Sequence, residues 1–475
     1  MSNKTNRQRA LLGEKTLGAL HKLIQTAKIH QNNNQLLIKC IKDFFDVLSS
    51  WWADDDELTI KLSHGRFLIQ DEKLYFQRDN AKLIQEMYQF FECRELSGLR
   101  FHSDIRSSSY EKILGFARLL NEASEKDNPL AWIVDGIKNE AFSWVKVLQL
   151  PKTSPHEQDF ERKDMARKTY AYALTSVKEV AQKINSQKRA GVRKLKRIAQ
   201  NMVDILSEDE SVMLGISTMR DYDDYTYSHS VNVAILSLCL GKRIGLSRIS
   251  LSYLAICGLV HDLGKLNIAK EILNKPGKLT DQEFKEMEEH PIKSVSQIMK
   301  MQAPEDLKAK ILLPPFEHHL KFDLSGYPQV QHKKSVSLFG RILAIADVFD
   351  ALTSPRIYRP IAYSPDRVLA TMLKGSGKDF DPILLKVFIN MLGVYPVGTL
   401  LKLNTGELGL VVDCQKNGDL TRPRIVLLVR NGDKFKKGKC VQLSAKHPET
   451  GSFKRNIVRS FHPSSFGLQP ADFIL

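Results

Sequence analysis

The sequence has few of the features that mark secreted or membrane proteins. Its 475 residues contain only six cysteines, scattered and without a Cys-x-x-Cys pair, which favours a reducing compartment. No apolar run is expected to span a bilayer, and residues 1–7 lack the apolar core of a signal peptide. We therefore expect a cytoplasmic protein without a membrane segment, whose input is a soluble molecule or another protein.

The basic residues are numerous but do not cluster into a recognition element. Lysine and arginine number 70 against 54 aspartates and glutamates, which gives a formal net charge of +16. The densest basic run, residues 183–197, has the pattern of a helix, and a solvated helix face is its simplest interpretation. Nucleic-acid binding is therefore not expected. With 43% hydrophobic and 26% charged residues, the composition is that of a soluble globular protein of two to four domains.

Four regions follow one another along the chain. Residues 1–151 mix helical periodicity with short alternating strands and predict an α+β domain. Residues 152–205 comprise a polar linker and a long helix, which either dimerises as a signalling helix, giving a homodimer, or packs within the chain. Residues 206–397 are helical, and residues 398–475 predict a small β-barrel or sheet. The fold class is thus multi-domain, with a mainly α domain between an N-terminal α+β domain and a small C-terminal β domain.

The N-terminal region shows no residues spaced for catalysis. Its histidines, His21, His30, His64 and His102, have no partners at metal-ligand spacing, so we expect a sensory or partner-binding role. Its helices are expected within 15–48, 81–91 and 109–123, and its strands at 58–62, 66–69, 73–76, 99–102 and 144–150. In the C-terminal region, strands are expected at 399–403, 408–412 and 424–429.

The central region contains a His-Asp pair, a separate histidine and a His-His pair, in this order. His261 and Asp262 follow the apolar run 253–260, and a charged pair at the end of a buried helix is costly unless it is paired or metal-bound. An imidazole holds one cation, whereas an aspartate can bridge two. A single histidine is more often a solvated residue, but the combination predicts a two-metal phosphohydrolase site. The candidate ligands are His229, His261, Asp262, His290, His318, His319 and Asp347.

In order and spacing, the motifs between residues 200 and 398 resemble those of HD-GYP proteins, a branch of the HD phosphohydrolase superfamily. The resemblance implies an HD-type helical bundle that acts in bacterial signal transduction by hydrolysing cyclic di-GMP to pGpG, GMP or both. The matching segments are residues 225–230, His261-Asp262-Leu263-Gly264-Lys265, Glu289-His290-Pro291, His318-His319, Gly326-Tyr327-Pro328 and 346–354.

The resemblance also implies a role for each ligand, with Asp262 as the bridge between two metals. The family uses iron or manganese, and the donors in this chain, imidazole and carboxylate without thiolate, also suit zinc. One metal would be held by His229, His261, Asp262 and Asp347, and the other by Asp262, His290, His318 and His319.

Four further residues are candidates for the reaction or for substrate contact. Lys265 lies four residues after His261, which on a helix places both on one face, and it is predicted to contact the phosphate or to protonate the leaving group. Its alternative is a solvated lysine near a helix C-terminus. Tyr327 is a candidate for stacking on guanine. Arg356 and Arg359 either grip a substrate phosphate or are surface charges.

Four positions depart from the family pattern. Leu320 replaces a glutamate that would orient a metal-bound histidine, and Leu324 replaces a glycine, at little cost unless its backbone needs a positive φ. Tyr225 stands where some members have a glutamate for a third metal, so two metals are expected, and Asn232 replaces an arginine. The alternative to an enzyme is an effector or scaffold that has lost turnover. A hybrid cyclic dinucleotide as substrate is disfavoured by the Gly-Tyr-Pro turn.

Overall fold

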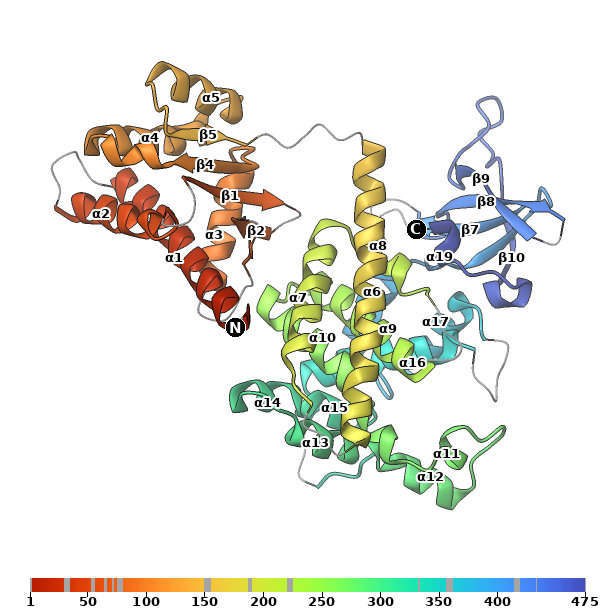
Figure 1. The fold of residues 1–475 in the computed structure, drawn as a ribbon. Coiled ribbons are helices and arrows are strands. Elements are labelled where there is room, and N and C mark those ends of the chain that lie inside the picture. The colour runs from red at the N-terminus through yellow and green to blue at the C-terminus, as the bar shows by residue number, and fades with distance from the viewer. Residues whose placement is uncertain are drawn as a thin grey trace. The chain divides into compact units, whose positions relative to one another are not determined.

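The chain divides into two compact units, residues 1–158 and residues 159–475. Figure 1 shows the fold and labels most of its helices and strands. A computed structural model describes the following parts of the chain: residues 2–29, 35–52, 56–63, 66–70, 72–74, 80–148, 155–186, 190–219, 225–331, 334–355, 362–413, 419–432 and 434–474.

The first unit is an antiparallel sheet covered by helices, as the α+β prediction requires. The strand order is β3-β2-β1-β4-β5, and alternate residues of the central strands are buried, so one face of the sheet packs on the core. The strands are β1 (Glu57–Ser63), β2 (Arg66–Ile69), β3 (Glu72–Lys73), β4 (Gly98–His102) and β5 (Val145–Val147). The helices are α1 (Ser2–Ile29), α2 (Gln35–Ser49), α3 (Ala81–Glu92), α4 (Tyr110–Glu122) and α5 (Pro129–Asn139), with short 3-10 turns η1 (Ser103–Ser107) and η2 (Ala123–Glu125).

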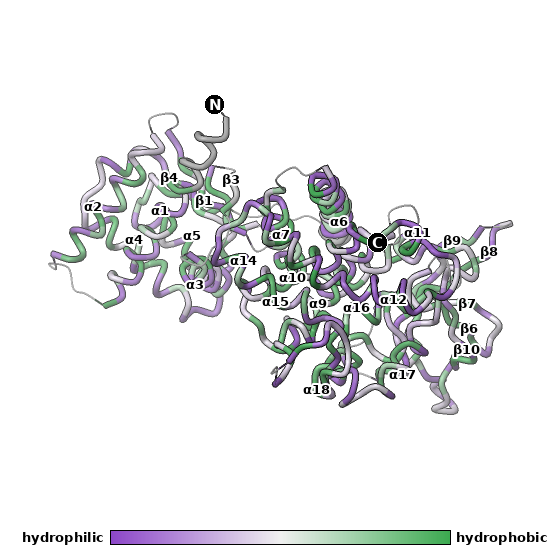
Figure 2. The backbone as a smooth tube through the Cα atoms, turned by 90° about the horizontal axis from the view of Figure 1, so that it is seen from below, coloured by the Kyte–Doolittle hydropathy of each residue, from purple (hydrophilic) through white to green (hydrophobic). Residues whose placement is uncertain are grey.

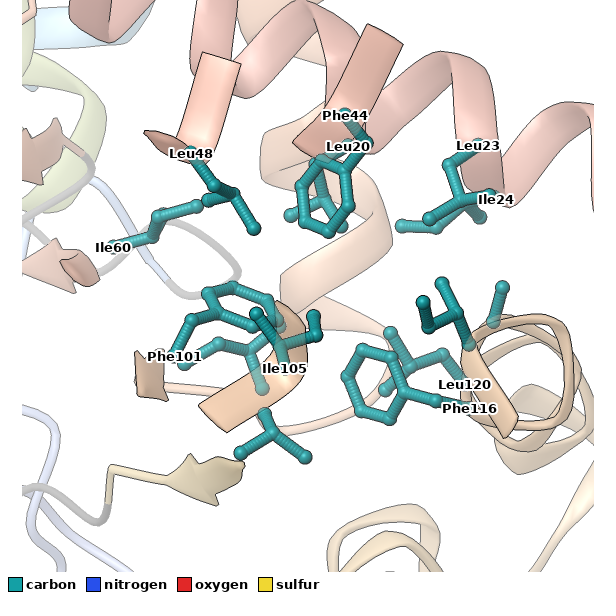
Figure 3. Packing of buried hydrophobic residues seen from close by; sticks show 14 of the residues in the cluster. Leu20, Leu23, Ile24, Phe44, Leu48, Ile60, Phe101, Ile105, Phe116 and Leu120 are labelled. Atoms are coloured by element: carbon teal, nitrogen blue, oxygen red, sulfur yellow. The ribbon is translucent and has the colours of Figure 1, made fainter. Parts of the chain in front are cut away.

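The core of this unit is built from large apolar side chains. Phe44 of α2 meets Phe101 of β4 edge-to-face at 5.6 Å between ring centroids, and Phe116 of α4 meets Phe101 at 6.1 Å (Figure 3). The sequence pattern had missed α5, although Asn128 caps it through a bond from the Ala131 N–H and Pro129 occupies its first turn.

The second unit begins with a helical bundle. Its helices are α6 (Pro155–Asn185), α7 (Arg193–Glu208), α8 (Glu210–Ile216), α9 (Tyr225–Arg243), α10 (Arg248–Val260), η3 (Leu263–Asn267, 3-10), α11 (Lys270–Leu273), α12 (Asp281–Glu288), α13 (His290–Lys300), α14 (Glu305–Ile311), α15 (Leu313–Glu317), α16 (Leu338–Thr353), α17 (Pro365–Lys374) and α18 (Pro382–Leu392). The basic run 183–197 is not one helix, because residues 190–192 leave the helical path and bond through their backbone to Gln302.

Helices α9 and α10 form the apolar centre of the bundle and are hydrophobic along much of their length (Figure 2). A Cβ on Gly258 would lie 2.6 Å from the Cα of Ala234, so glycine is what lets these helices approach closely. Contrary to expectation, the stretch Arg248–Asn267 is long and apolar enough to meet the criterion for a membrane-spanning helix, but 72% of its apolar window is buried inside the protein. It is α10 followed by η3, a core element of the bundle.

The chain ends in a five-stranded antiparallel sheet with order β10-β6-β7-β8-β9, followed by the 3-10 turn η4 (Pro463–Phe466) and helix α19 (Ala471–Ile474). The strands are β6 (Leu400–Leu403), β7 (Leu408–Asp413), β8 (Arg424–Asn431), β9 (Lys434–Gln442) and β10 (Ile457–Phe461). The pattern had missed β9, which is rich in exposed lysines, and the short strand β10. The predicted fold class is confirmed, while the predicted boundaries at 205 and 397 stay predictions.

Candidate metal centre

The seven predicted ligands come together inside the helical bundle from separate elements. The structure forms two groups of three whose ligand atoms lie within 4.8 Å of one another: His229, His261 and Asp262, and His290, His318 and His319. Asp347 joins the first group, because its Oδ1 lies 2.9 Å from Nε2 of His229. His229 lies on α9, His261 and Asp262 lie between α10 and η3, His290 begins α13, His318 and His319 follow α15, and Asp347 lies on α16.

A short polar link fixes the His-Asp turn against α13. The Ser294 hydroxyl donates to the His261 carbonyl at 2.7 Å and accepts from the Gly264 N–H at 2.7 Å. A Cβ on Gly264 would lie 2.0 Å from the carbonyl oxygen of His290, so only glycine permits this approach. Ser294 is fully buried, and the sequence pattern gave it no role.

The two oxygens of Asp262 face different histidines. Its Oδ2 lies 3.4 Å from Nε2 of His261 and 3.7 Å from Nε2 of His229. Its Oδ1 lies 3.4 Å from Nε2 of His290 and 3.9 Å from Nε2 of His318. One carboxylate therefore has one oxygen directed at each half of the site, which is the arrangement that a bridging ligand requires.

Three of the imidazoles are oriented by backbone carbonyls. The Nδ1–H groups of His261, His290 and His318 donate to the carbonyls three residues earlier, at 2.8, 2.8 and 2.6 Å. This bond places the proton on Nδ1 and leaves the Nε2 lone pair directed into the site.

His229 is held between two carboxylates instead. Its Nε2 lies 2.9 Å from Asp347 and its Nδ1 lies 2.8 Å from Asp350. Burial lowers the pKa of His229, but the hydrogen bonds with Asp347 and Asp350 outweigh burial and raise it to about 9. Asp350 had no predicted role, although it lies one helical turn after Asp347 on the same face of α16.

The site is built for cations. Burial lowers the pKa of His290 to about 3 and that of His319 to about 4, so both rings are neutral. Burial opposes ionisation of Asp262, yet the neighbouring His261 and Lys265 hold its pKa well below the usual range. Within the described residues, His261 Nε2 and Asp262 Oδ1 are buried without a hydrogen-bond partner. The neutral imidazoles of His290 and His319, the ionised carboxylate of Asp262 and the buried donor atoms without a hydrogen-bond partner fit divalent metal ions.

Glu317 joins the two parts of the chain that carry the remaining ligands. It is fully buried, and its Oε2 accepts from the N–H of Ser337 at 3.0 Å and from the Ser337 hydroxyl. Ser337 caps α16, the helix of Asp347, by accepting from the Gly340 N–H at 3.1 Å. Glu317 therefore couples the His318 segment to the start of α16, a role that its place beside the histidines in the sequence did not reveal.

Comparison with known protein families identifies the region of the chain that carries the candidate ligands. Residues 179–384 match the family model described as HD domain, and this span includes all seven candidate ligands. The chain contains an HD domain. The resemblance seen in the motifs is thereby confirmed for this part of the chain.

Relatives of the HD domain act on cyclic dinucleotides, according to their names. A cyclic di-GMP phosphodiesterase of Pseudomonas aeruginosa is 33% identical over 231 residues, 48% of this chain and 54% of that protein. A cyclic di-GMP phosphodiesterase of Vibrio cholerae is 38% identical over 133 residues, 27% of each chain. A 3′3′-cGAMP-specific phosphodiesterase of Vibrio cholerae is 34% identical over 171 residues, 35% of this chain and 36% of that protein. The chain thus spans about half the length of these relatives, or less.

The residues predicted to contact the substrate differ in how close they lie to the metal ligands and in whether the structure describes them. Lys265 lies near the ligands, with its ammonium 2.5 Å from Asp262 Oδ2, but it lies on η3, because α10 ends at Val260. The α-helical spacing from His261 was therefore the wrong reason for its position. The Tyr327 ring lies 4.7 Å from the His319 ring. Arg356 and Arg359 lie outside the described residues.

The departures from the family pattern are explained by the HD domain's structure. Leu320 is fully buried, and His318 is oriented by a backbone carbonyl rather than by a carboxylate at position 320. Leu324 has a φ of 66°, so this position does use the conformation that favours glycine and carries the strain. A capping box at Thr280 opens α12, and the helix of His290 begins separately at α13.

Proposed function

We propose that the protein is a metal-dependent phosphodiesterase that hydrolyses cyclic di-GMP to pGpG, GMP or both at a two-metal site. The observation that carries the proposal is the division of Asp262, whose Oδ2 faces His229 and His261 while Oδ1 faces His290 and His318. The names of the relatives support a cyclic dinucleotide as the substrate class. Iron and manganese are proposed as the metals, since the donors are imidazoles and carboxylates without a thiolate.

The residues of this site would have different roles in the reaction. Two bound divalent cations supply neutralisation of the phosphodiester and activation of the attacking water. Asp262 holds the two halves together, and the backbone-oriented imidazoles keep their Nε2 atoms directed inward. Lys265, whose side chain is 18% exposed, places its ammonium 2.5 Å from Oδ2 of Asp262, where it would contact the phosphate or give a proton to the departing ribose oxygen.

The second candidate substrate is 3′3′-cGAMP. Three relatives named for it are 32–37% identical to this chain, within the 27–38% range of those named for cyclic di-GMP. The two substrates differ in one nucleobase, and the metal ligands would contact neither base. A side-by-side comparison of kcat/KM for the two compounds decides between them.

The experiment that tests the proposal compares Asp262→Asn with the wild type. Protein is purified without oxygen, its metal content is determined, and cyclic di-GMP is added. We expect pGpG or GMP from the wild type only. Asp306→Asn, which changes an exposed carboxylate on α14, should behave as the wild type. Two metals without product would favour the effector alternative, and absence of metal from the wild type would contradict the site.

The first unit is proposed to receive the input signal. Its described residues form no His, Cys, Asp or Glu group of the kind that holds a metal. Dimerisation through α6 and a cytoplasmic location stay proposals. The five cysteines in the described part of the chain are free, which agrees with a reducing compartment.

A further inference from the structure

We propose that Phe284 of α12, next to Tyr327, forms an aromatic subsite on which one guanine base of the substrate stacks. The inference rests on the proposed function, because it adds a nucleobase subsite to the same metal centre. It also reassigns the stacking role that the sequence favoured for Tyr327.

A chain of rings leads from the metal ligands to Phe284. The Tyr327 ring lies 4.7 Å from the His319 ring at 30°, and 6.2 Å from the His290 ring at 75°. It also lies 6.2 Å from the Phe284 ring at 81°. Tyr327 therefore contacts both the ligand rings and Phe284. Phe284 remains 46% exposed, so its ring is accessible to a ligand.

Backbone hydrogen bonds fix the position of Tyr327. Its N–H donates to the His319 carbonyl at 3.0 Å, and the Gly326 N–H donates to the Leu320 carbonyl at 3.0 Å. A Cβ on Gly326 would lie 2.0 Å from the His319 carbonyl oxygen, so the turn needs glycine to bring Tyr327 this close. The Gly-Tyr-Pro turn thereby holds the Tyr327 ring beside His319.

Helix α12 holds the exposed ring in place without contributing to the core. None of its eight residues is buried. Its N-terminus has a complete capping box between Thr280 and Glu283, and the Lys275 ammonium lies 2.6 Å from a Glu283 oxygen. The helix ends beside the ligand His290, whose Nδ1–H donates to the Met287 carbonyl, and it presents Phe284 to solvent. Single exposed phenylalanines are common on protein surfaces. The ring contact with Tyr327, which lies beside the metal ligands, distinguishes Phe284 from them.

The chemistry of the substrate fits the arrangement. A cyclic dinucleotide places its bases beside its phosphates, so a phosphate held near Asp262 and Lys265 directs one base away from the ligands. Stacking on an aromatic side chain tolerates any base and strengthens binding substantially. Loss of the ring should raise KM roughly ten- to a hundredfold, with little effect on kcat.

A tryptophan at this position would report the contact directly. The four native tryptophans, at positions 51, 52, 132 and 144, all lie in the first unit. In the metal-loaded full-length Phe284→Trp variant, we expect GMP to quench the introduced indole, and ribose 5-phosphate at equal concentration not to. GMP that inhibits hydrolysis without changing this emission would overturn the subsite.

Kinetics provide the second arm. Phe284→Leu should raise the KM for cyclic di-GMP with unchanged metal content, whereas Phe284→Tyr should restore the wild-type value. Ile292→Ala, which removes another exposed apolar side chain nearby in the sequence, is the matched control and should leave KM unchanged. A wild-type KM for Phe284→Leu would contradict the proposal. If the wild type does not hydrolyse cyclic di-GMP, the proposed function fails, and the quenching by GMP alone then decides on the subsite.

Discussion

The two units of the chain bury different kinds of side chain. In the described part of residues 1–158, the buried polar side chains are Thr16, Asn80 and Arg94, and the core consists of aliphatic and aromatic groups. The described part of the HD domain buries four histidines and seven acidic residues, of which Asp262, Glu317, Asp347 and Asp350 lie at or beside the metal centre. Burying ionisable groups opposes folding unless they are paired or bind ligands. The difference indicates that the first core consists almost entirely of apolar packing, whereas the interior of the HD domain also contains a polar site.

Histidines show the same contrast. In the first unit, His21 lies 3.3 Å from Glu86 and His102 lies 3.0 Å from Asp104, each pair near the surface. In the HD domain, His229 is buried between Asp347 and Asp350. A single carboxylate partner at the surface adds little, whereas convergence of several donors on one buried point makes a site.

The largest effect should come from damage to the first core. Trp144 packs against Phe116 at 5.2 Å and Phe142 at 5.7 Å between ring centroids. Trp144→Ala should lower the free energy of unfolding of the first unit by about 3–5 kcal/mol, because it leaves a large cavity. Thermal unfolding followed by the fluorescence of the remaining tryptophans measures this. Metal content should not change, and a loss of metal would show that the two units are not independent.

Removal of metal should lower the stability of the second unit. A ligand at a thousandfold excess over its Kd stabilises the folded state by about 4 kcal/mol, so a chelator should lower the unfolding temperature of the HD domain. Circular dichroism should report this shift, since most helices belong to the second unit. Tryptophan fluorescence, which reports the first unit, should not. Equal shifts in circular dichroism and in tryptophan fluorescence would show that the two units do not differ in their dependence on metal.

A smaller effect is expected from Asp350→Asn. The change removes a charge that holds Nδ1 of His229 at 2.8 Å, and loss of such a supporting group weakens metal binding roughly ten- to a hundredfold. Metal titration of the variant, with Asp306→Asn as the exposed control, measures it. Wild-type affinity would show that Asp347 alone orients His229.

These residues also show what the sequence could reveal. The order of motifs identified all seven candidate ligands, because histidine and aspartate spacings reflect the elements that carry them. Ser294 and Glu317 were beyond reach, since their importance depends on contacts between segments distant in the chain. Asp350 could have been found from its spacing to Asp347 on one helix. Strand β9 was missed because its exposed lysines, which suit a sheet edge, hide the alternation.

A crystal structure of the metal-loaded protein with anomalous diffraction data tests the bridging role of Asp262 most directly. We predict two metal peaks, one bound to Oδ2 on the side of His229 and His261, and one bound to Oδ1 on the side of His290 and His318. Each metal–oxygen distance should be about 2.0–2.2 Å. A single peak, or two peaks that Asp262 does not join, would contradict the proposed centre.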